Sequence, residues 1–395
     1  MAWNKERFIS GLESGRLLPS LSPLTMRLIE LASDDNSSLN DIAALIEKDP
    51  SLTIRILKLA NSVFFRPRHL AKSVQQAVLR IGVRQTRLLA LSLLLKDTFP
   101  MGKVGAADYR RFWRLCLYQG LIAQSLAQQL KMGDAEEAFT AGFTQEIGLL
   151  VLLHAFADLD GTADIPWYPL PHLLEWEKQN YGVDHREIGE FMLARWKFPA
   201  SFILCQKSTV FTGEIDELLP LVRVCGMASQ LSAFICEPGA CLPEVFDTLE
   251  LRFALPKPLI HEVVATALQQ VDELAQTFEV EVDSKRDMVD LMEKARAALA
   301  QLSGRLLERH SPSDTALPSF ASLQNHGDST DAVRYALGAV KHEIRNPLTA
   351  VGGFVRMLAK TINPTSDQGM YIKVILSETQ KLEQALKGIG QMLAR

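Results

Sequence analysis

The chain has 395 residues, which at about 150 residues per domain suggests two or three domains. Hydrophobic residues make up 47% and charged residues 22%, a composition that excludes a disordered or fibrous chain. Lys and Arg total 42 against 46 for Asp and Glu, and the net charge of −4 excludes a chain-wide positive field for nucleic acid. We therefore expect no nucleic-acid partner.

The longest apolar stretches, Leu88–Leu95 and Ile147–Leu153, fall far short of the roughly 20 residues needed to cross a bilayer, so we expect no membrane insertion. The opening residues Met1–Arg7 are charged and precede no apolar core, so we expect no secretory signal. The five cysteines form no C-x-x-C pair, which argues against a disulfide framework or a zinc knuckle. These observations predict a cytoplasmic protein with reduced thiols.

Apolar residues recur every three or four positions along most of the chain, which predicts an all-α fold. Ser38 or Asn40 can cap an early helix that ends at Asp49-Pro50, because the residue before a proline disfavours the helical conformation. Leu88–Leu95 is apolar on nearly all sides, as expected for a central buried helix.

The helical pattern divides into blocks. A break after Phe99 separates a first helical block, residues 1–107, from a second, residues 108–283. Apolar residues between Met288 and Leu306 then repeat every four and three positions, which favours a dimeric coiled coil over residues 284–310. A single amphipathic helix packed on its own domain would show a similar pattern. Residues 311–331, rich in Ser, Pro, Asp and Asn, are typical of a linker.

Residues 332–395 contain two long helical patterns joined by the short turn Asn363–Asp367. Both helices carry a regular apolar seam, which predicts an antiparallel hairpin. Two helices cannot surround a core, so the hairpin is expected to pair with a second copy in a four-helix bundle, and the protein to be a homodimer.

His342 lies two positions from each of the seam residues Val340 and Ile344, which points its imidazole away from the seam. The adjacent Glu343 can orient the ring and make it more nucleophilic, and Asn346, one turn on, can donate to phosphate oxygens. Pro347 removes a backbone hydrogen bond and bends the helix, which makes a plausible signalling hinge beside the reactive residue.

These residues, His342–Thr349 (HEIRNPLT), resemble the H-box of the dimerisation and phosphoacceptor domain of bacterial sensor histidine kinases. The resemblance implies that His342 accepts phosphate, that Glu343 acts as base and that Asn346 assists phosphoryl transfer. The Glu-x-x-Asn pattern also resembles the family's site for dephosphorylating a partner response regulator.

A kinase of this family has an ATP-binding domain after the hairpin. The sequence shows none before it ends at Arg395, and no P-loop pattern occurs anywhere. We therefore expect no cofactor and no autophosphorylation by the chain alone. Two alternatives therefore stay open: His342 accepts a phosphoryl group, or the hairpin serves only for dimerisation.

Residues 18–283 resemble the HDOD family of bacterial signalling domains, an all-helical family related to the HD metal phosphohydrolases. The blocks that carry the resemblance are Leu18–Leu21, Leu45–Leu52, Leu57–Ser62, Ser73–Val78, Phe112–Arg114, Ala138–Phe143, Asp184–Gly189 and Trp196–Pro199.

The HD hydrolases hold a divalent metal through a histidine, an adjacent His-Asp pair and a later aspartate, and the metal activates a water. At the corresponding positions this chain has Leu115 and the pair Gln145-Glu146, while His185 is kept. Leucine has no lone pair and glutamine is a poor ligand, so we predict no metal and a catalytically degenerate site. Gln145 and Glu146 either bond to backbone or water, or line a degenerate pocket that still binds a ligand.

The sequence thus predicts a bacterial signal-transduction protein that is not an autonomous enzyme. A degenerate HDOD domain would regulate the hairpin through the coiled coil, and the hairpin would act in a two-component phosphorelay or as a docking scaffold. Its expected partners are a response-regulator receiver domain or a separate sensor kinase. The alternatives are a residual HD-type phosphohydrolase and a response-regulator phosphatase that uses Glu343 and Asn346.

Overall fold

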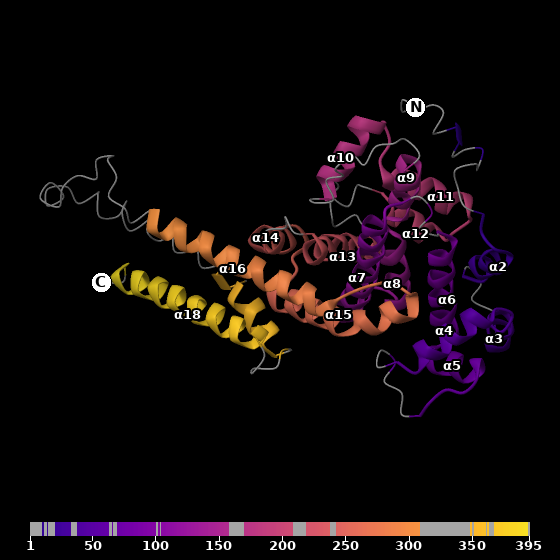
Figure 1. The fold of residues 1–395 in the computed structure, drawn as a ribbon, viewed down its shortest axis with the longest axis horizontal. Helices are drawn as coiled ribbons and strands as arrows, with labels where there is room; N and C mark the ends of the chain where they lie inside the picture. Colours follow the sequence, from indigo (N-terminus) through magenta and orange to yellow (C-terminus); the bar gives the residue numbers. More distant parts are fainter. Residues whose placement is uncertain are drawn as a thin grey trace, which may run out of the picture. The chain divides into compact units, whose positions relative to one another are not determined.

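The computed structural model describes residues 20–32, 38–62, 69–99, 104–157, 170–207, 219–237, 242–308, 348–349, 351–360 and 367–393, with isolated positions at 10, 11, 14, 65, 102 and 362. Within these residues all regular structure is helical, which confirms the all-α fold class (Figure 1). Among the helices that are described, none is both long and apolar enough to cross a bilayer.

The contacts divide the chain into two compact units. The first unit comprises Met1–Ala240 and Thr266–Ser284, and the second comprises Cys241–Ala265 and Lys285–Arg395. The long helix α15 (Lys257–Phe278) contributes to both.

From residue 20 onward, the described part of the first unit begins with a series of helices. They are α2 (Pro23–Ala32), α3 (Leu39–Ile46), α4 (Pro50–Ala60), α5 (Val74–Ile81) and α6 (Val83–Thr98). Ser38 caps α3 by accepting a hydrogen bond from the backbone N–H of Asp41, which confirms one of the two expected caps. Asp49 caps α4 in the same way, with Pro50 as the first helical residue, where a missing N–H costs nothing. Leu88–Leu95 lies buried in α6 as predicted.

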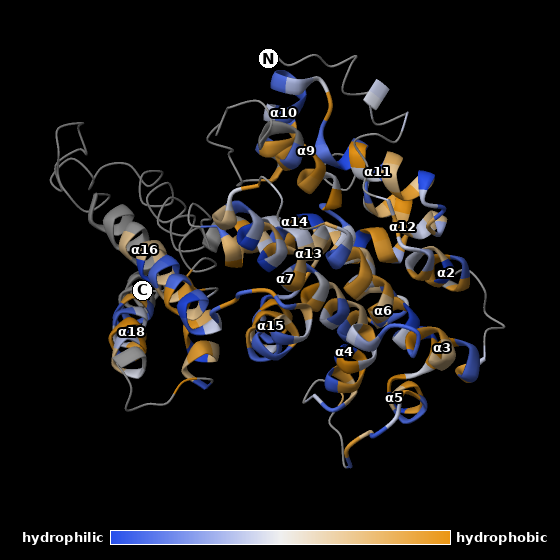
Figure 2. Ribbon diagram, turned by 45° about the vertical axis from the view of Figure 1, so that its right-hand side comes forward, coloured by the Kyte–Doolittle hydropathy of each residue, from blue (hydrophilic) through white to orange (hydrophobic). Residues whose placement is uncertain are grey.

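The remaining helices of the first unit include the long α7 (Ala106–Leu130), which packs against both α8 and α13. The others are α8 (Ala135–Thr144), α9 (Ile147–Ala157), α10 (Leu170–Tyr181), α11 (His185–Arg195), α12 (Ala200–Cys205) and α13 (Pro220–Cys236). Hydrophobic residues run along α9, whereas α3 and α15 show one hydrophobic and one hydrophilic side (Figure 2). An aromatic cluster of Phe112, Trp113, Phe139, Phe143 and Phe278 closes the core between α7, α8 and α15.

The second unit contains α14 (Leu242–Phe253), the first part of α15, α16 (Ser284–Glu308), a helix over residues 351–360 and α18 (Asp367–Leu393). Helices α16 and α18 run side by side in both views (Figures 1 and 2). Met292 and Ala295, two residues of the expected coiled-coil seam, are buried within the single chain. That burial is what a helix packed on its own chain produces. The predicted coiled coil and domain boundaries stay predictions.

Candidate functional site

The pair predicted at the HD-like site lies at the junction of α8 and α9. Gln145 and Glu146 form the link between the two helices, and both side chains are fully buried. Leu115, on α7, is also buried. His185 is the first residue of α11 and is fully buried as well. All four residues predicted for this site therefore lie in the interior of the first unit.

Glu146 and His185 are in direct contact. The Nε2 atom of His185 lies 2.7 Å from Oε2 of Glu146, although 39 residues separate the two in the chain. Gly148 allows this approach, because a Cβ atom at that position would lie 1.9 Å from the backbone oxygen of His185. The tight packing of α9 on α11 therefore needs a residue without a side chain beside Glu146.

Arg186, which the sequence analysis gave no role, holds both oxygens of Glu146. Its Nη2 donates to Oε1 at 2.6 Å and its Nε donates to Oε2 at 3.1 Å. This two-point contact is the strong geometry of arginine and carboxylate, and both side chains are almost completely buried. The guanidinium thus places a buried positive charge directly on both oxygens of Glu146.

Glu177, on α10, is a second residue that the sequence analysis missed. It accepts a hydrogen bond from the backbone N–H of His185 at 2.9 Å, and its Oε2 lies 2.7 Å from Nδ1 of the same histidine. The imidazole is therefore clamped between two carboxylates, one on each ring nitrogen. No signal in the sequence marks Glu177, because its partner depends on how α10 turns back onto α11.

Neutral side chains complete the network. The amide of Gln119 donates to Gln145 and to Oε1 of Glu146, the latter at 3.0 Å. The amide of Gln145 donates to the backbone oxygen of Cys205 at 3.0 Å, and Ser229 accepts from Arg186 at 3.2 Å. Gln145 thus has one bond to backbone, whereas Glu146 bonds to side chains, so the two interpretations left open for this pair stay predictions.

The electrostatics of the network favour charged forms. Burial alone raises the pKa of Glu146, but the charge of Arg186 and the hydrogen bond from His185 outweigh it and hold that pKa far below its usual value. Burial lowers the pKa of His185, but Glu177 and Glu146 outweigh it and raise that pKa from 6.5 to about 10. Two carboxylates thus face one guanidinium and one imidazolium, and the charges balance.

This arrangement does not fit a divalent metal ion. A metal site needs several lone pairs directed at one point, and both nitrogens of His185 are instead directed at carboxylates. Both oxygens of Glu146 are taken by Arg186, and Leu115 offers no donor atom. Within the described residues no group of three or more His, Cys, Asp or Glu side chains could hold a metal.

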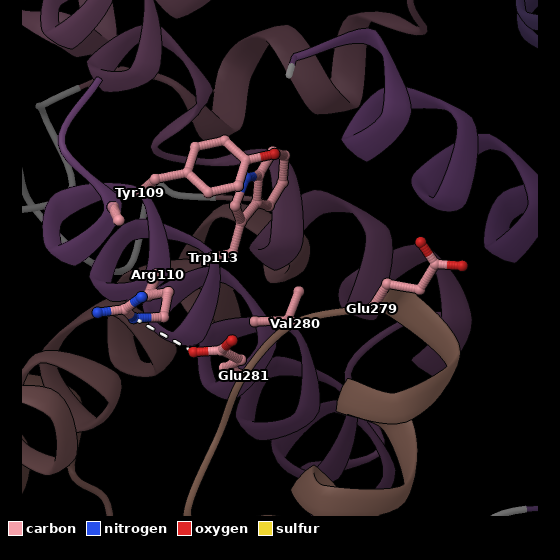
Figure 3. A pocket seen from close by; sticks show the side chains of 7 residues that line it. Tyr109, Arg110, Trp113, Glu279, Val280 and Glu281 are labelled. Atoms are coloured by element: carbon pink, nitrogen blue, oxygen red, sulfur yellow. Dashed lines mark ion pairs between the residues drawn. The ribbon is translucent and has the colours of Figure 1, made fainter. Parts of the chain in front are cut away.

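A separate cavity of about 170 Å³ lies elsewhere in the first unit (Figure 3). It lies beside the start of α7, where Tyr109 and Trp113 form one wall, and the turn after α15 forms the other. An ion pair between Arg110 and Glu281, 3.4 Å apart, joins the two walls. Of the described residues that the sequence predicted for a functional site, none lines this cavity.

The H-box residues His342, Glu343, Asn346 and Pro347 lie outside the described residues. The helix that follows, residues 351–360, packs on α18 as expected for a hairpin: Arg356 pairs with Glu383 at 3.4 Å. Seam residues of both helices are buried, namely Val351, Val355, Leu358, Ile372, Ile375 and Thr379.

Comparison with known proteins agrees with both resemblances. Residues 18–208 match the model of the HDOD domain, and residues 332–390 match that of the His Kinase A (phospho-acceptor) domain. An uncharacterised protein of Treponema pallidum (strain Nichols) is 25% identical over 200 residues. That match covers 47% of this chain and only 36% of the relative.

Two solved structures share the fold of the larger part of the chain. A putative signal transduction protein from Marinobacter aquaeolei VT8 is 21% identical with a TM-score of 0.54, covering 68% of this chain and 61% of that one. A putative metal-dependent phosphohydrolase from Shewanella amazonensis SB2B is also 21% identical with a TM-score of 0.53, covering 69% of this chain and 97% of that one. At this identity the likeness shows the fold alone.

The two matched ranges are characteristic of signal transduction, and the histidine-kinase match includes the position of His342. The chain therefore contains one segment, residues 18–208, that matches the HDOD domain and another, residues 332–390, that matches the His Kinase A (phospho-acceptor) domain, a combination that indicates a signal-transduction protein.

Proposed function

We propose that the HDOD domain is a non-catalytic regulatory domain, and that it controls a hairpin whose His342 accepts a phosphoryl group from a separate sensor kinase. The phosphoryl group, or the docked hairpin itself, then engages a response-regulator receiver domain. The chain would thus act within a two-component phosphorelay or as its scaffold.

The observation that carries the first half of this proposal is the closed network around Glu146. An HD hydrolase needs a metal with an exposed water, whereas here Arg186 occupies both oxygens of the carboxylate and His185 is enclosed by Glu146 and Glu177. No side chain of this set is exposed to solvent, so neither water nor a phosphoester can reach it. This disfavours the alternative of a residual metal phosphohydrolase.

The second half is supported by the match of residues 332–390 to the phosphoacceptor domain together with the motif His342–Thr349. An imidazole nitrogen that attacks the γ-phosphorus of ATP on a kinase forms an N–P bond as the bond to ADP breaks, and the ring proton passes to a base. Glu343, directly beside the histidine, is the residue suited to accept that proton.

The test is incubation of the purified full chain with radiolabelled ATP, first alone and then with a panel of sensor kinases. We expect acid-labile, base-stable label on the wild type in the presence of a kinase and none on His342→Ala. The matched control is His326→Ala, which removes another histidine of the C-terminal region and should leave the labelling unchanged.

Equal labelling of His342→Ala and wild type would refute the assigned acceptor. Failure of every kinase to label the wild type would refute phosphotransfer. In that case the remaining alternative is a response-regulator phosphatase, for which the chain should accelerate loss of phosphate from a phosphorylated receiver domain and Asn346→Ala should abolish the effect.

A further inference from the structure

The helix over residues 351–360 carries two adjacent glycines, Gly352 and Gly353. Each costs a helix interior about 1 kcal/mol relative to alanine, so a pair of them needs a reason in the packing. A Cβ atom on Gly352 would lie 2.7 Å from Cγ2 of Thr379 on α18. One on Gly353 would lie 2.4 Å from Cε1 of His261 on α15. The two glycines therefore permit close approach to two different helices.

The contact with α15 belongs to an aromatic cluster inside the second unit. Phe354 meets Phe246 of α14 edge to face, with the ring centroids 6.2 Å apart at 84°. His261 lies against both, 6.0 Å from the Phe354 ring and 5.3 Å from the Phe246 ring. Phe246 and Phe354 are both fully buried. Edge-to-face rings in this range attract one another beyond the area that they bury.

This cluster lies beside the seam through which the hairpin is expected to dimerise, since Phe354 directly precedes the seam residue Val355. Val351, Val355 and Leu358 of the predicted seam are fully buried within the single chain. The contacts of Gly353 and Phe354 with α14 and α15 therefore flank the side chains that a second copy of the hairpin would have to reach.

The covering residues come from a part of the sequence that neither family model matches. Phe246 and His261 lie between residue 208, where the HDOD match ends, and residue 332, where the histidine-kinase match begins. They nevertheless belong to the same compact unit as the hairpin.

We propose that the segment Cys241–Ala265 is an intramolecular partner of the hairpin that masks the seam of helix 351–360 and thereby opposes homodimerisation. Release of Phe354 from Phe246 and His261 exposes the seam to a second copy. This inference rests on the proposed role of the hairpin as a dimerisation element, but not on phosphorylation of His342.

The test measures the dimerisation constant of the full chain by sedimentation over a range of concentrations. Gly353→Ala improves helix propensity but collides with His261, so we expect the dimerisation constant to tighten about tenfold. Because the three atoms nearest to this Cβ all belong to the imidazole ring of His261, adding Gly353→Ala to a His261→Ala background should change the constant by less than about twofold.

Gly352→Ala is the matched control. It makes the same chemical change one residue away but disturbs the hairpin itself, against Thr379, and should not tighten dimerisation. Hydrogen exchange provides a second measurement: amides of residues 351–360 should be protected in the monomeric wild type and lose protection in His261→Ala.

Unchanged or weaker dimerisation of Gly353→Ala would overturn the proposal, as would unprotected amides in the monomeric wild type or the absence of dimers in every variant. The proposed phosphotransfer fails separately, through the labelling of His342, so the two results are distinguishable.

Discussion

Substitution of Arg186 by methionine tests the network around Glu146 most directly. The change keeps an unbranched apolar chain in place of the arginine's aliphatic part but removes the guanidinium that donates to both oxygens of Glu146. Two buried carboxylates, Glu146 and Glu177, then face the single imidazolium of His185. Loss of one partner from a buried ion pair costs about 3–5 kcal/mol, a large share of the roughly 5–15 kcal/mol that stabilise a typical domain.

The double variant Glu146→Gln with Arg186→Met isolates the pair. It removes one negative and one positive charge and leaves Glu177 paired with His185, so the charge balance returns. We expect it to be more stable than Arg186→Met alone by about 2 kcal/mol, because neighbouring residues of one network are not additive. Arg84→Met is the control: Arg84 also pairs with two acidic residues, Asp134 and Glu137, but is 45% exposed, so the loss should stay below about 1 kcal/mol.

The assay is urea unfolding at pH 7.5 followed by tryptophan fluorescence. All five tryptophans fall within Met1–Ala240, so the signal reports the first unit alone. If Arg186→Met lost no more stability than Arg84→Met, or if the double variant were no more stable than Arg186→Met, the network would not be the electrostatic centre that the geometry indicates.

Three further predictions use the same assay. The pKa of His185 is raised to about 10 in the folded chain, so the protonated imidazole stabilises the fold fully below pH 6.5 and this contribution is lost as the pH rises through 10. The free energy of unfolding should fall by up to about 1.4 kcal/mol per pH unit between pH 7 and 9.5. This slope should be absent from His185→Gln and kept in the control His69→Gln. Treatment with EDTA, or addition of millimolar Mn²⁺, should leave the urea midpoint of unfolding unchanged. If EDTA removed a bound metal and lowered that midpoint, the argument that the site does not fit a metal would be wrong. Gly148→Ala should lower the free energy of unfolding by more than about 2 kcal/mol or prevent folding, because the new Cβ meets the backbone oxygen of His185. The control is Gly105→Ala, whose Cβ would meet its nearest atom at 3.6 Å and which should cost less than about 1 kcal/mol. Equal losses in the two variants would count against the close approach of α9 and α11.

The features that the sequence predicted correctly are those set by neighbours along the chain. Ser38 caps α3 because its hydroxyl reaches the N–H three residues ahead, and the burial of Leu88–Leu95 follows from a helix that is apolar on all sides. The two family resemblances were confirmed for a similar reason, since each depends on ordered blocks of residues that can be recognised without coordinates. The roles of His342, Glu343 and Asn346 stay predictions.

The tertiary structure alone decided which charges and which packing surfaces meet. Glu146 pairs with Arg186 from 40 residues away, and Phe246 packs on Phe354, which lies in a different helix of the same unit. A buried charge is stable only beside a partner of opposite charge. Which residue becomes that partner depends on how the chain folds between the two positions, and the periodicity and local spacing of the sequence do not specify this. The sequence by itself determined the helical fold class and the family that each matched range resembles. The fold determined that an arginine and an imidazolium lie against the two buried carboxylates, and that Phe246 and His261 pack on Phe354 of the hairpin.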